Sequence, residues 1–180
     1  MKTFNSVKTI GFILYFSILF SSCGKFFKDD ELSLTRVPYT GNELRIDGYY
    51  FYEHSDPARI DIYFLYRNGI ILYGGTPLSS EIKETENKIQ TDRWHEIIKN
   101  DITSWGVFHV NGSTIKFERW YPSSGGGAPS AVREGKILND STFHITVSYR
   151  SNGSERNEKD EIYHFREFAP KPDSTNNFIK

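Results

Sequence analysis

The sequence predicts an all-β domain that closes into an eight-stranded antiparallel up-and-down barrel with one short helix. Aromatic residues make up 16% of the chain although its mean hydropathy is −0.53, so bulky strand-forming side chains lie in an otherwise polar sequence. Apolar and polar residues alternate over short segments, as they do in strands with one wet face. Tight-turn dipeptides separate several of these segments, which indicates sequential hairpins.

Three of the turns are specific enough to define hairpins. The pairs Asn68-Gly69, Asn111-Gly112 and Asn139-Asp140 favour the positive φ angles of type I′ turns, whose twist matches the flanking strands. The six strands that they join are 59–66, 70–73, 105–110, 114–120, 131–138 and 142–149. A first strand at 44–52 and a last strand at 161–168, with the last hairpin centred on Ser154, complete a meander of eight.

The alternation predicts which side chains face inward. The predicted inward set is Ile60, Ile62, Phe64 and Tyr66 in one strand and Phe143, Ile145, Val147 and Tyr149 in another. Between them, residues 81–101 break the alternation. A helix that starts at Thr91 places Trp94, Ile97 and Ile98 on one side, and we expect it to cover one end of the barrel.

A meander of eight strands leaves two exposed edges unless the first strand pairs with the last. Closure into a barrel removes both edges, which favours the barrel over the alternative of a two-sheet sandwich. An eight-stranded barrel has an interior that is either filled by side chains or holds one small ligand. The sequence leaves both possibilities open.

Residues 1–22 have the pattern of an export signal. Lys2 and Lys8 precede an apolar run at 10–20, and the small pair Ser21-Ser22 follows it. A transmembrane helix needs about 20 apolar residues, and this run is shorter. The segment 19–23 resembles the lipobox of bacterial lipoproteins, which implies that Cys23 carries the lipid. The alternative is that an ordinary signal peptidase cuts nearby and that Cys23 is incidental.

The lipobox resemblance implies a place in the cell envelope, with the membrane as partner through the lipid anchor. Gly24 is not the aspartate of inner-membrane retention, which favours the outer membrane, on its periplasmic or surface side. The acidic run at 28–31 resembles a surface-export tag, with a solvated tether as the alternative reading. We expect a flexible tether over 23–42, one barrel domain over 43–168 and a disordered tail over 169–180.

The barrel resembles the lipocalin-like lipoproteins of Bacteroidota. The resemblance rests on Gly48-Tyr49-Tyr50, the Asn68-Gly69 hairpin, Trp105-Gly106 and the strand at 162–168, and it covers residues 43–168. It implies a non-catalytic binding module for a small apolar ligand or an envelope protein partner. The aromatic residues expected to line a ligand pocket are Tyr49, Phe64, Tyr66, Trp105, Phe117, Phe143 and Tyr149. The alternative is a structural or assembly lipoprotein with a filled barrel.

Other kinds of chemistry find little support in the sequence. The formal charge of −1 argues against nucleic acid, and a single cysteine argues against disulfides. No catalytic or cofactor motif is present, so we expect no enzyme. His144 and His164 are expected to face each other as an exposed pair without a metal. The acidic groups Asp29-Asp30, Glu84/Glu86 and Asp160-Glu161 are interpreted as solvated surface.

Overall fold

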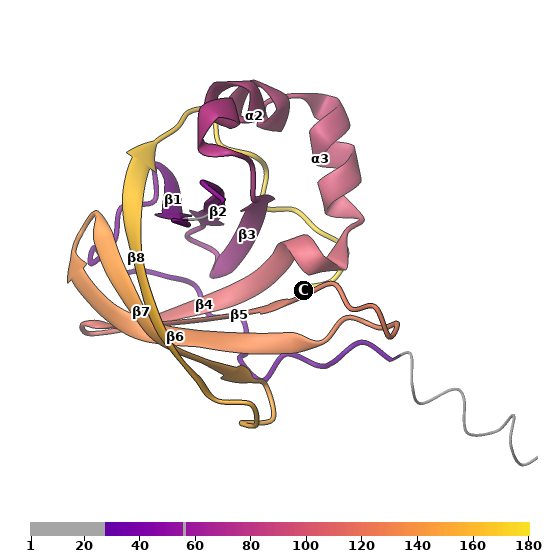
Figure 1. Ribbon diagram of the computed structural model, residues 1–180, viewed down its shortest axis with the longest axis vertical. Helices are drawn as coiled ribbons and strands as arrows, with labels where there is room; N and C mark the ends of the chain where they lie inside the picture. Colours follow the sequence, from indigo (N-terminus) through magenta and orange to yellow (C-terminus); the bar gives the residue numbers. More distant parts are fainter. Residues whose placement is uncertain (1–27, 56) are drawn as a thin grey trace, which may run out of the picture.

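The computed structural model describes residues 28–55 and 57–180, and the predicted leader and Cys23 lie outside these ranges. The described residues form eight strands in one closed barrel, in which every strand pairs with its neighbours in the sequence (Figure 1). The strands are β1 (Gly48–Glu53), β2 (Ile60–Leu65), β3 (Ile70–Gly75), β4 (Trp105–Asn111), β5 (Thr114–Trp120), β6 (Ser130–Asn139), β7 (Thr142–Arg150) and β8 (Asn157–Glu167).

Closure joins the first strand to the last. Strand β1 pairs antiparallel with β8, with Gly48 opposite Glu167 and Phe51 opposite His164. Every pairing around the ring is antiparallel, which confirms the up-and-down barrel. The sandwich alternative is wrong, because pairing of β1 with β8 leaves no free edge at which two sheets would separate.

The predicted hairpins form where the turn residues stand, but the predicted type I′ geometry is wrong. Gly69 and Gly112 adopt positive φ angles of 82° and 56°, whereas Asn68, Asn111, Asn139 and Asp140 do not, and a type I′ turn needs a positive φ at both central residues. The last hairpin turns slightly earlier than predicted, because Gly153 takes a φ of 85° and the Arg150 N–H donates to the Ser154 carbonyl. Strand β8 therefore begins at Asn157, four residues before the predicted start.

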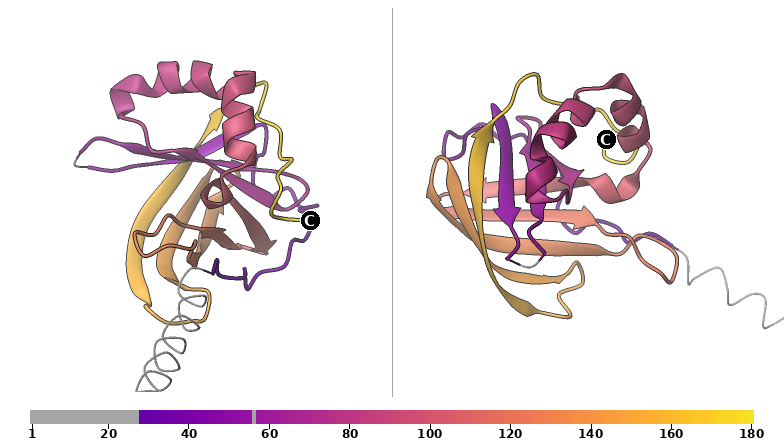
Figure 2. Two further views of the ribbon diagram at one scale, coloured as in Figure 1. Left: turned by 90° about the vertical axis from the view of Figure 1, so that its right-hand side faces the viewer. Right: turned by 45° about the horizontal axis from the view of Figure 1, so that its top comes forward.

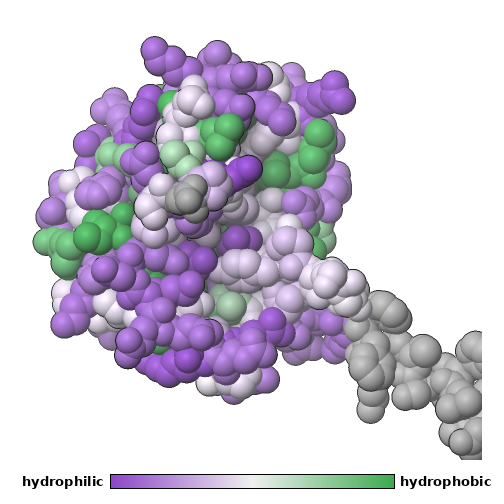
Figure 3. Space-filling view, viewed as in Figure 1, coloured by the Kyte–Doolittle hydropathy of each residue, from purple (hydrophilic) through white to green (hydrophobic). Residues whose placement is uncertain are grey.

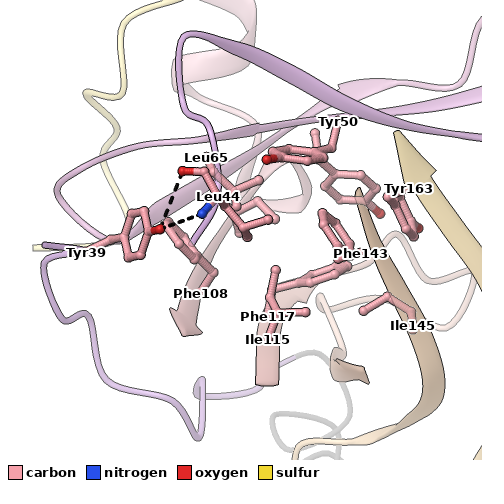
Figure 4. Close-up of a cluster of buried hydrophobic side chains, with 12 residues drawn as sticks. Tyr39, Leu44, Tyr50, Leu65, Phe108, Ile115, Phe117, Phe143, Ile145 and Tyr163 are labelled. Atoms are coloured by element: carbon pink, nitrogen blue, oxygen red, sulfur yellow. Dashed lines mark hydrogen bonds between the residues drawn. The ribbon is translucent and has the colours of Figure 1, made fainter. Parts of the chain in front are cut away.

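The barrel interior holds one of two hydrophobic layers. Buried side chains from around the ring meet there, among them Tyr50, Phe117, Phe143 and Tyr163 (Figure 4). Tyr39, from the chain before β1, packs into the same layer and contacts Phe108 with ring centroids 5.6 Å apart. The N-terminal segment therefore helps to fill the barrel at one end.

The second hydrophobic layer lies outside the barrel wall. Helices α2 (Ile82–Ile89) and α3 (Asp92–Lys99) lie over the outer side of β1–β3, as Figures 1 and 2 show. Ile89 and Trp94 bury their side chains against this wall. The described residues thus hold two short α-helices where one was expected, and these helices cover a side of the barrel and not an end. The predicted cap is confirmed, since the Trp94 N–H donates to Thr91 Oγ1.

The second layer explains why the inward face of β2 was predicted wrongly. Ile62 and Phe64 belong to the outer layer, whereas Tyr63 and Leu65 face the interior. All six residues of β2 are buried, because the strand has core on both faces. Alternation of apolar and polar residues predicts which face of a strand contacts solvent, and neither face of β2 does.

A bulge changes the face of β7 partway along the strand. Phe143 and Ile145 face the interior as predicted. Ile145 lies opposite Gly135, but Val147 lies opposite the adjacent residue Glu134. Because directly opposed residues share a face, Val147 and the following Tyr149 turn outward, contrary to the prediction.

The segments before and after the barrel pack against it. The backbone N–H groups of Ser33 and Leu34 donate to the buried Glu118 carboxylate at 2.9 and 2.7 Å. After β8, Lys171 Nζ donates to the carbonyls of Ile46 and Leu65 at 2.6 and 2.7 Å. The structure therefore differs from the expected free tether and disordered tail, because polar groups of both segments complete hydrogen bonds on the barrel.

The surface is largely polar. On the face in Figure 3, hydrophobic residues form small separate patches among hydrophilic ones. Among the described residues, the exposed large hydrophobic side chains are Val37, Ile97, Leu138 and Ile162. Ile97 was predicted to face the protein with Trp94, but 58% of it is exposed. Within the described ranges, no helix has the length and apolar character needed to cross a bilayer.

Candidate functional site at the polar end of the barrel

The seven aromatic residues predicted to line one pocket are divided between three environments. Only Phe117 and Phe143 belong to the interior layer. The outer layer takes up Tyr49, Phe64 and Trp105, with Tyr66 at its margin. Tyr149 lies on the outside of the wall and donates to Glu134 at 3.0 Å. The structure does not bring these residues together, because the second hydrophobic layer and the bulge in β7 were not visible in the alternation.

Aromatic rings fill the apolar half of the interior. The Phe143 and Tyr163 rings stack with centroids 4.8 Å apart and an interplanar angle of 12°. Phe117 contacts both of these rings edge-on, with centroid separations of 6.5 and 6.4 Å. Leu44 closes this half, where its N–H donates to Tyr39 Oη at 2.8 Å (Figure 4). All of these side chains are buried. This half of the barrel is a packed core.

The opposite end of the interior is polar, and Arg119 lies at its centre. The end is formed by the C-terminal residues of β1, β3, β5 and β7 and the N-terminal residues of the other four strands. Arg119 follows Phe117 on the inward face of β5, and only 5% of it is exposed. Its Cζ lies 4.0 Å from the ring centroid of Tyr73 and 3.9 Å from that of Tyr121. The guanidinium group is thus held between two phenol rings by cation–π contacts.

The hydrogen bonds of Arg119 do not include a carboxylate. Its Nε donates to Tyr63 Oη at 3.3 Å, and its Nη1 donates to the carbonyls of Thr103 and Trp120 at 2.8 and 2.9 Å. Burial lowers the pKa of Arg119, but the neighbouring phenol groups outweigh burial and hold the pKa above its ordinary value. The group therefore stays charged in the interior.

A second arginine, whose side chain is 14% exposed, forms an ion pair at the same end. Arg133 Nη1 donates to Glu161 Oε2 at 2.6 Å and to Tyr163 Oη at 2.8 Å. Tyr163 Oη in turn donates to Glu161 Oε2 at 3.1 Å, which closes a triangle of three groups. Burial raises the pKa of the Tyr163 phenol well above its ordinary value, so the phenol remains a hydrogen-bond donor.

Asp61 balances the charge on the β2 side of the polar end. Its Oδ1 accepts hydrogen bonds from Thr76 Oγ1 at 2.7 Å and from Tyr73 Oη at 3.3 Å. His54 Nε2 lies 3.2 Å from the other carboxylate oxygen but lacks hydrogen-bond geometry. The two buried acids therefore already have their own donors within the chain.

Three buried polar atoms at the polar end lack a hydrogen-bond partner among the described residues. Arg133 Nε is a donor, Tyr121 Oη can donate or accept, and His54 Nε2 lies 3.2 Å from Asp61 without hydrogen-bond geometry. A buried polar atom without a hydrogen bond costs roughly 1–3 kcal/mol, so such atoms are rare in native structures. The Tyr121 ring packs against the Arg119 guanidinium group. The polar end can therefore offer hydrogen bonds to an additional acceptor.

The sequence analysis missed every charged residue of this site. Glu161 was interpreted as solvated surface, but it faces inward opposite Ile145 and is 7% exposed. Glu86 was interpreted in the same way, yet it accepts from Tyr49 Oη at 2.9 Å and pairs with Arg166. The available signal was the position of Arg119 two residues after Phe117, which places both side chains on one face of a strand.

The histidines do not meet as predicted. His144 lies opposite Ile162 and not opposite His164, because the last hairpin turns earlier. His144 Nε2 instead forms an ion pair with Asp160 at 2.7 Å on the outside of the barrel. Within residues 28–55 and 57–180, no group of three or more His, Cys, Asp or Glu side chains is arranged to hold a metal ion.

Comparisons of the chain with protein-family models, curated proteins and solved structures found no match.

Proposed function

We propose that this chain is a lipid-anchored protein of the bacterial cell envelope that acts as a non-catalytic binding module. The export pattern of residues 1–22 and the lipobox resemblance at Cys23 support attachment to the outer membrane, on its periplasmic or surface side. The closed barrel supports a binding role, because small barrels present a protected interior at one end. No residue is assigned a catalytic role.

The polar end is the proposed binding site. The observation that carries this proposal is that Arg133 Nε and Tyr121 Oη are buried without partners among the described residues, with the Tyr121 ring packed on the guanidinium group of Arg119. Arg133 Nε can only donate a hydrogen bond and Tyr121 Oη is able to donate one, so the matching ligand group is an acceptor with negative charge, such as a carboxylate or a phosphate. The apolar part of such a ligand would lie outside the filled half of the interior.

A structural or assembly role with a filled barrel is the second candidate. The stacked rings of Phe143 and Tyr163 favour it, because they occupy the half in which an apolar ligand would otherwise lie. The two candidates differ in what the polar end does. In the structural alternative, the polar end binds nothing from solution.

Native mass spectrometry of the protein purified from its own membrane tests the anchor and the ligand together. We expect the mass of acyl chains on Cys23 and a retained anionic small molecule. A Cys23→Ser variant should lose the acyl mass. An unmodified thiol mass would contradict the lipid anchor, whatever the result for the ligand.

Binding of defined probes tests the polar end directly. Octanoate and octyl phosphate should bind in calorimetry, whereas octyltrimethylammonium should not. Tyr121→Phe removes one unpartnered donor and should weaken octyl phosphate binding by about tenfold, the worth of one hydrogen bond to a charged group. Tyr149→Phe, which removes a hydroxyl from the outer wall, is the matched control and should leave binding unchanged. If neither anion binds and no ligand is retained, the structural alternative replaces the binding module.

A further inference from the structure

We infer that the N-terminal segment holds the polar end of the barrel against the membrane, where its donors receive the anionic headgroup of a bilayer lipid. This inference rests on the proposed lipid anchor and on the proposed binding site. It adds the orientation of the barrel and the source of the ligand.

The N-terminal segment reaches the barrel at its polar end. Asp30 is fixed to the rim of the polar end by several bonds. Its N–H donates to the Ala128 carbonyl at 3.0 Å, and its carbonyl accepts from Trp120 Nε1 at 2.6 Å. Its carboxylate accepts from the Ser130 N–H at 2.9 Å and from Arg150 Nη2 at 3.1 Å. All four partners lie at or beside the polar ends of β5, β6 and β7.

A second contact strengthens this attachment. The Ala128 N–H donates to Asp29 Oδ1 at 2.7 Å. The glycine-rich connection between β5 and β6 is thereby tied to the segment that leads toward Cys23. The acidic pair Asp29-Asp30, which was interpreted as solvated surface, thus fixes the chain to the barrel.

From Asp30 the segment runs away from the polar end along the outer wall. Ser33 and Leu34 bond to Glu118 on β5, and the Thr35 carbonyl lies 2.6 Å from His109 Nε2 on β4. Farther along, the Tyr39 N–H donates to the Arg67 carbonyl, in the turn between β2 and β3 at the opposite end. The chain therefore enters at the polar end and finishes at the apolar end.

The length of chain between Cys23 and Asp29 then sets the orientation. Six residue steps separate them, so their distance is at most roughly 20 Å even when fully extended. After the tilt of barrel strands, the wall is roughly 18 Å high at the seven-residue strand β5 and about 25 Å high at the ten-residue strand β6. While Asp30 remains bound, a lipid on Cys23 can reach the level of the apolar end only if the connecting residues are fully extended along the wall. The arrangement that needs no such extension has the polar end nearer the bilayer.

The hydrogen-bond donors of the polar end fit a headgroup at that surface, although its two arginines are balanced by Asp61 and Glu161. Among the described residues, Arg119 has no carboxylate as a hydrogen-bond partner, Arg133 Nε and Tyr121 Oη have no partner, and the Tyr121 ring packs on Arg119. A lipid phosphate supplies acceptors with negative charge in the plane to which the barrel is tied. Phosphatidylglycerol is the probe that represents this chemistry.

Fluorescence quenching measures the orientation. The acylated full chain is placed in vesicles of phosphatidylcholine and phosphatidylglycerol that carry a headgroup quencher. A fluorophore is attached through Ser124→Cys at the polar end or Ser113→Cys at the apolar end, both exposed positions. We expect strong loss of fluorescence at position 124 and little loss at position 113. Equal loss at both positions, or greater loss at 113, would overturn the orientation.

A longer tether provides the matched control. Insertion of a Gly-Ser linker of about 20 residues after Lys28 leaves the contacts of Asp30 in place but extends the reach by an average of about 25 Å. The difference between positions 113 and 124 should then shrink markedly. If the difference persists unchanged, the short connection to Asp30 does not set the orientation.

Lipid retention tests the headgroup. After release from the vesicles, native mass spectrometry should show retained phosphatidylglycerol in the wild type and in Tyr149→Phe, and several-fold less in Tyr121→Phe. Retention of added inorganic phosphate in place of the lipid would overturn the lipid source while the proposed anion site stands. Absence of acyl mass in the same spectra would show that the proposed anchor itself has failed.

Discussion

The two halves of the barrel interior are built on different principles. In the apolar half, Phe117, Phe143 and Tyr163 fill the space with ring contacts and leave no charge to satisfy. In the polar half, the buried Arg119 and the partly buried Arg133 lie with two buried acids, and three polar atoms remain without partners among the described residues. Packing alone accounts for the first half. The second half retains groups that cost stability, which is the pattern expected at a functional site.

The largest expected effect is the loss of a ring in the apolar half. Phe143→Ala removes a fully buried side chain that stacks on Tyr163, and we expect the free energy of unfolding to fall by about 3–5 kcal/mol. Urea denaturation measures this loss. Leu138→Ala, at a side chain that is 56% exposed, is the control and should change little. A small loss at Phe143 would mean that this half is not a tightly packed core.

The next largest effect concerns the ion pair in the polar half, where a single and a double variant separate the contribution of charge to stability from that of packing. Arg133→Met removes the closer cation from the buried Glu161, which keeps the Tyr163 hydroxyl and Lys159 Nζ at 3.6 Å, and we expect a loss of about 3 kcal/mol. The double variant Arg133→Met with Glu161→Leu removes both charges and should recover most of that stability. Failure of the double variant to recover would show that the ion pair itself stabilises the fold.

The third effect is a dependence of the free energy of unfolding on pH. It comes from Lys171, a cation that is largely buried near the apolar end of the barrel. Burial lowers the pKa of Lys171 from 10.5 to about 8, an effect that Asp47 partly opposes. Between these pH values, Lys171 keeps its proton in the unfolded chain and loses it in the folded chain. The free energy of unfolding therefore rises with pH. The slope is less than about 1 kcal/mol per pH unit, because solvent screens part of the effect.

Comparison of the wild type with Lys171→Met isolates this dependence. From pH 8 to pH 10, the wild type should gain stability relative to the variant in chemical denaturation. Above about pH 10 the stability of both proteins should fall, because burial raises the pKa values of Tyr49 and Tyr50 and the unfolded chain then loses protons that the folded chain retains. Parallel curves from pH 8 to pH 10 would contradict the lowered pKa.

The smallest expected change in stability comes from a substitution on the outer wall, away from both halves of the interior. The ion pair of His144 with Asp160 lies on the outer wall, and the Asp160 side chain is 90% exposed. His144→Ala should change the free energy of unfolding by less than about 1 kcal/mol. Zinc should not alter the melting temperature of either protein. A clear shift with zinc would revive the metal site that the structure does not show among the described residues.

Much of the barrel could be predicted because its turns are local. Each of the dipeptides at Asn68, Asn111 and Asn139 specifies a hairpin within a few residues, and closure follows from the number of strands and the cost of free edges. The length and start of β8 were less certain, because the turn at Gly153 has no flanking apolar run that defines it.

The site was harder to predict because facing direction is a tertiary property. The period of two in β2 is clear, but either set of residues can point inward when helices cover the outside. Once β2 was assigned to the wrong face, Asp61 was excluded from the interior. The bulge between Ile145 and Val147 then reversed the end of β7 as well. Contacts of Asp30 and Lys171 join segments far apart in the sequence, and no local pattern reveals them.

Pairing of β1 with β8 also limits when the protein can fold. Gly48 and Glu167 lie almost the whole length of the domain apart, yet they are neighbours in the ring. The barrel cannot close until the final strand is available, and contacts of such long sequence separation form slowly. A chain that is still emerging, or one truncated before β8, exposes the edges of β1 and β7 to other strands. An exported form of this domain would therefore need protection from aggregation until its last residues arrive.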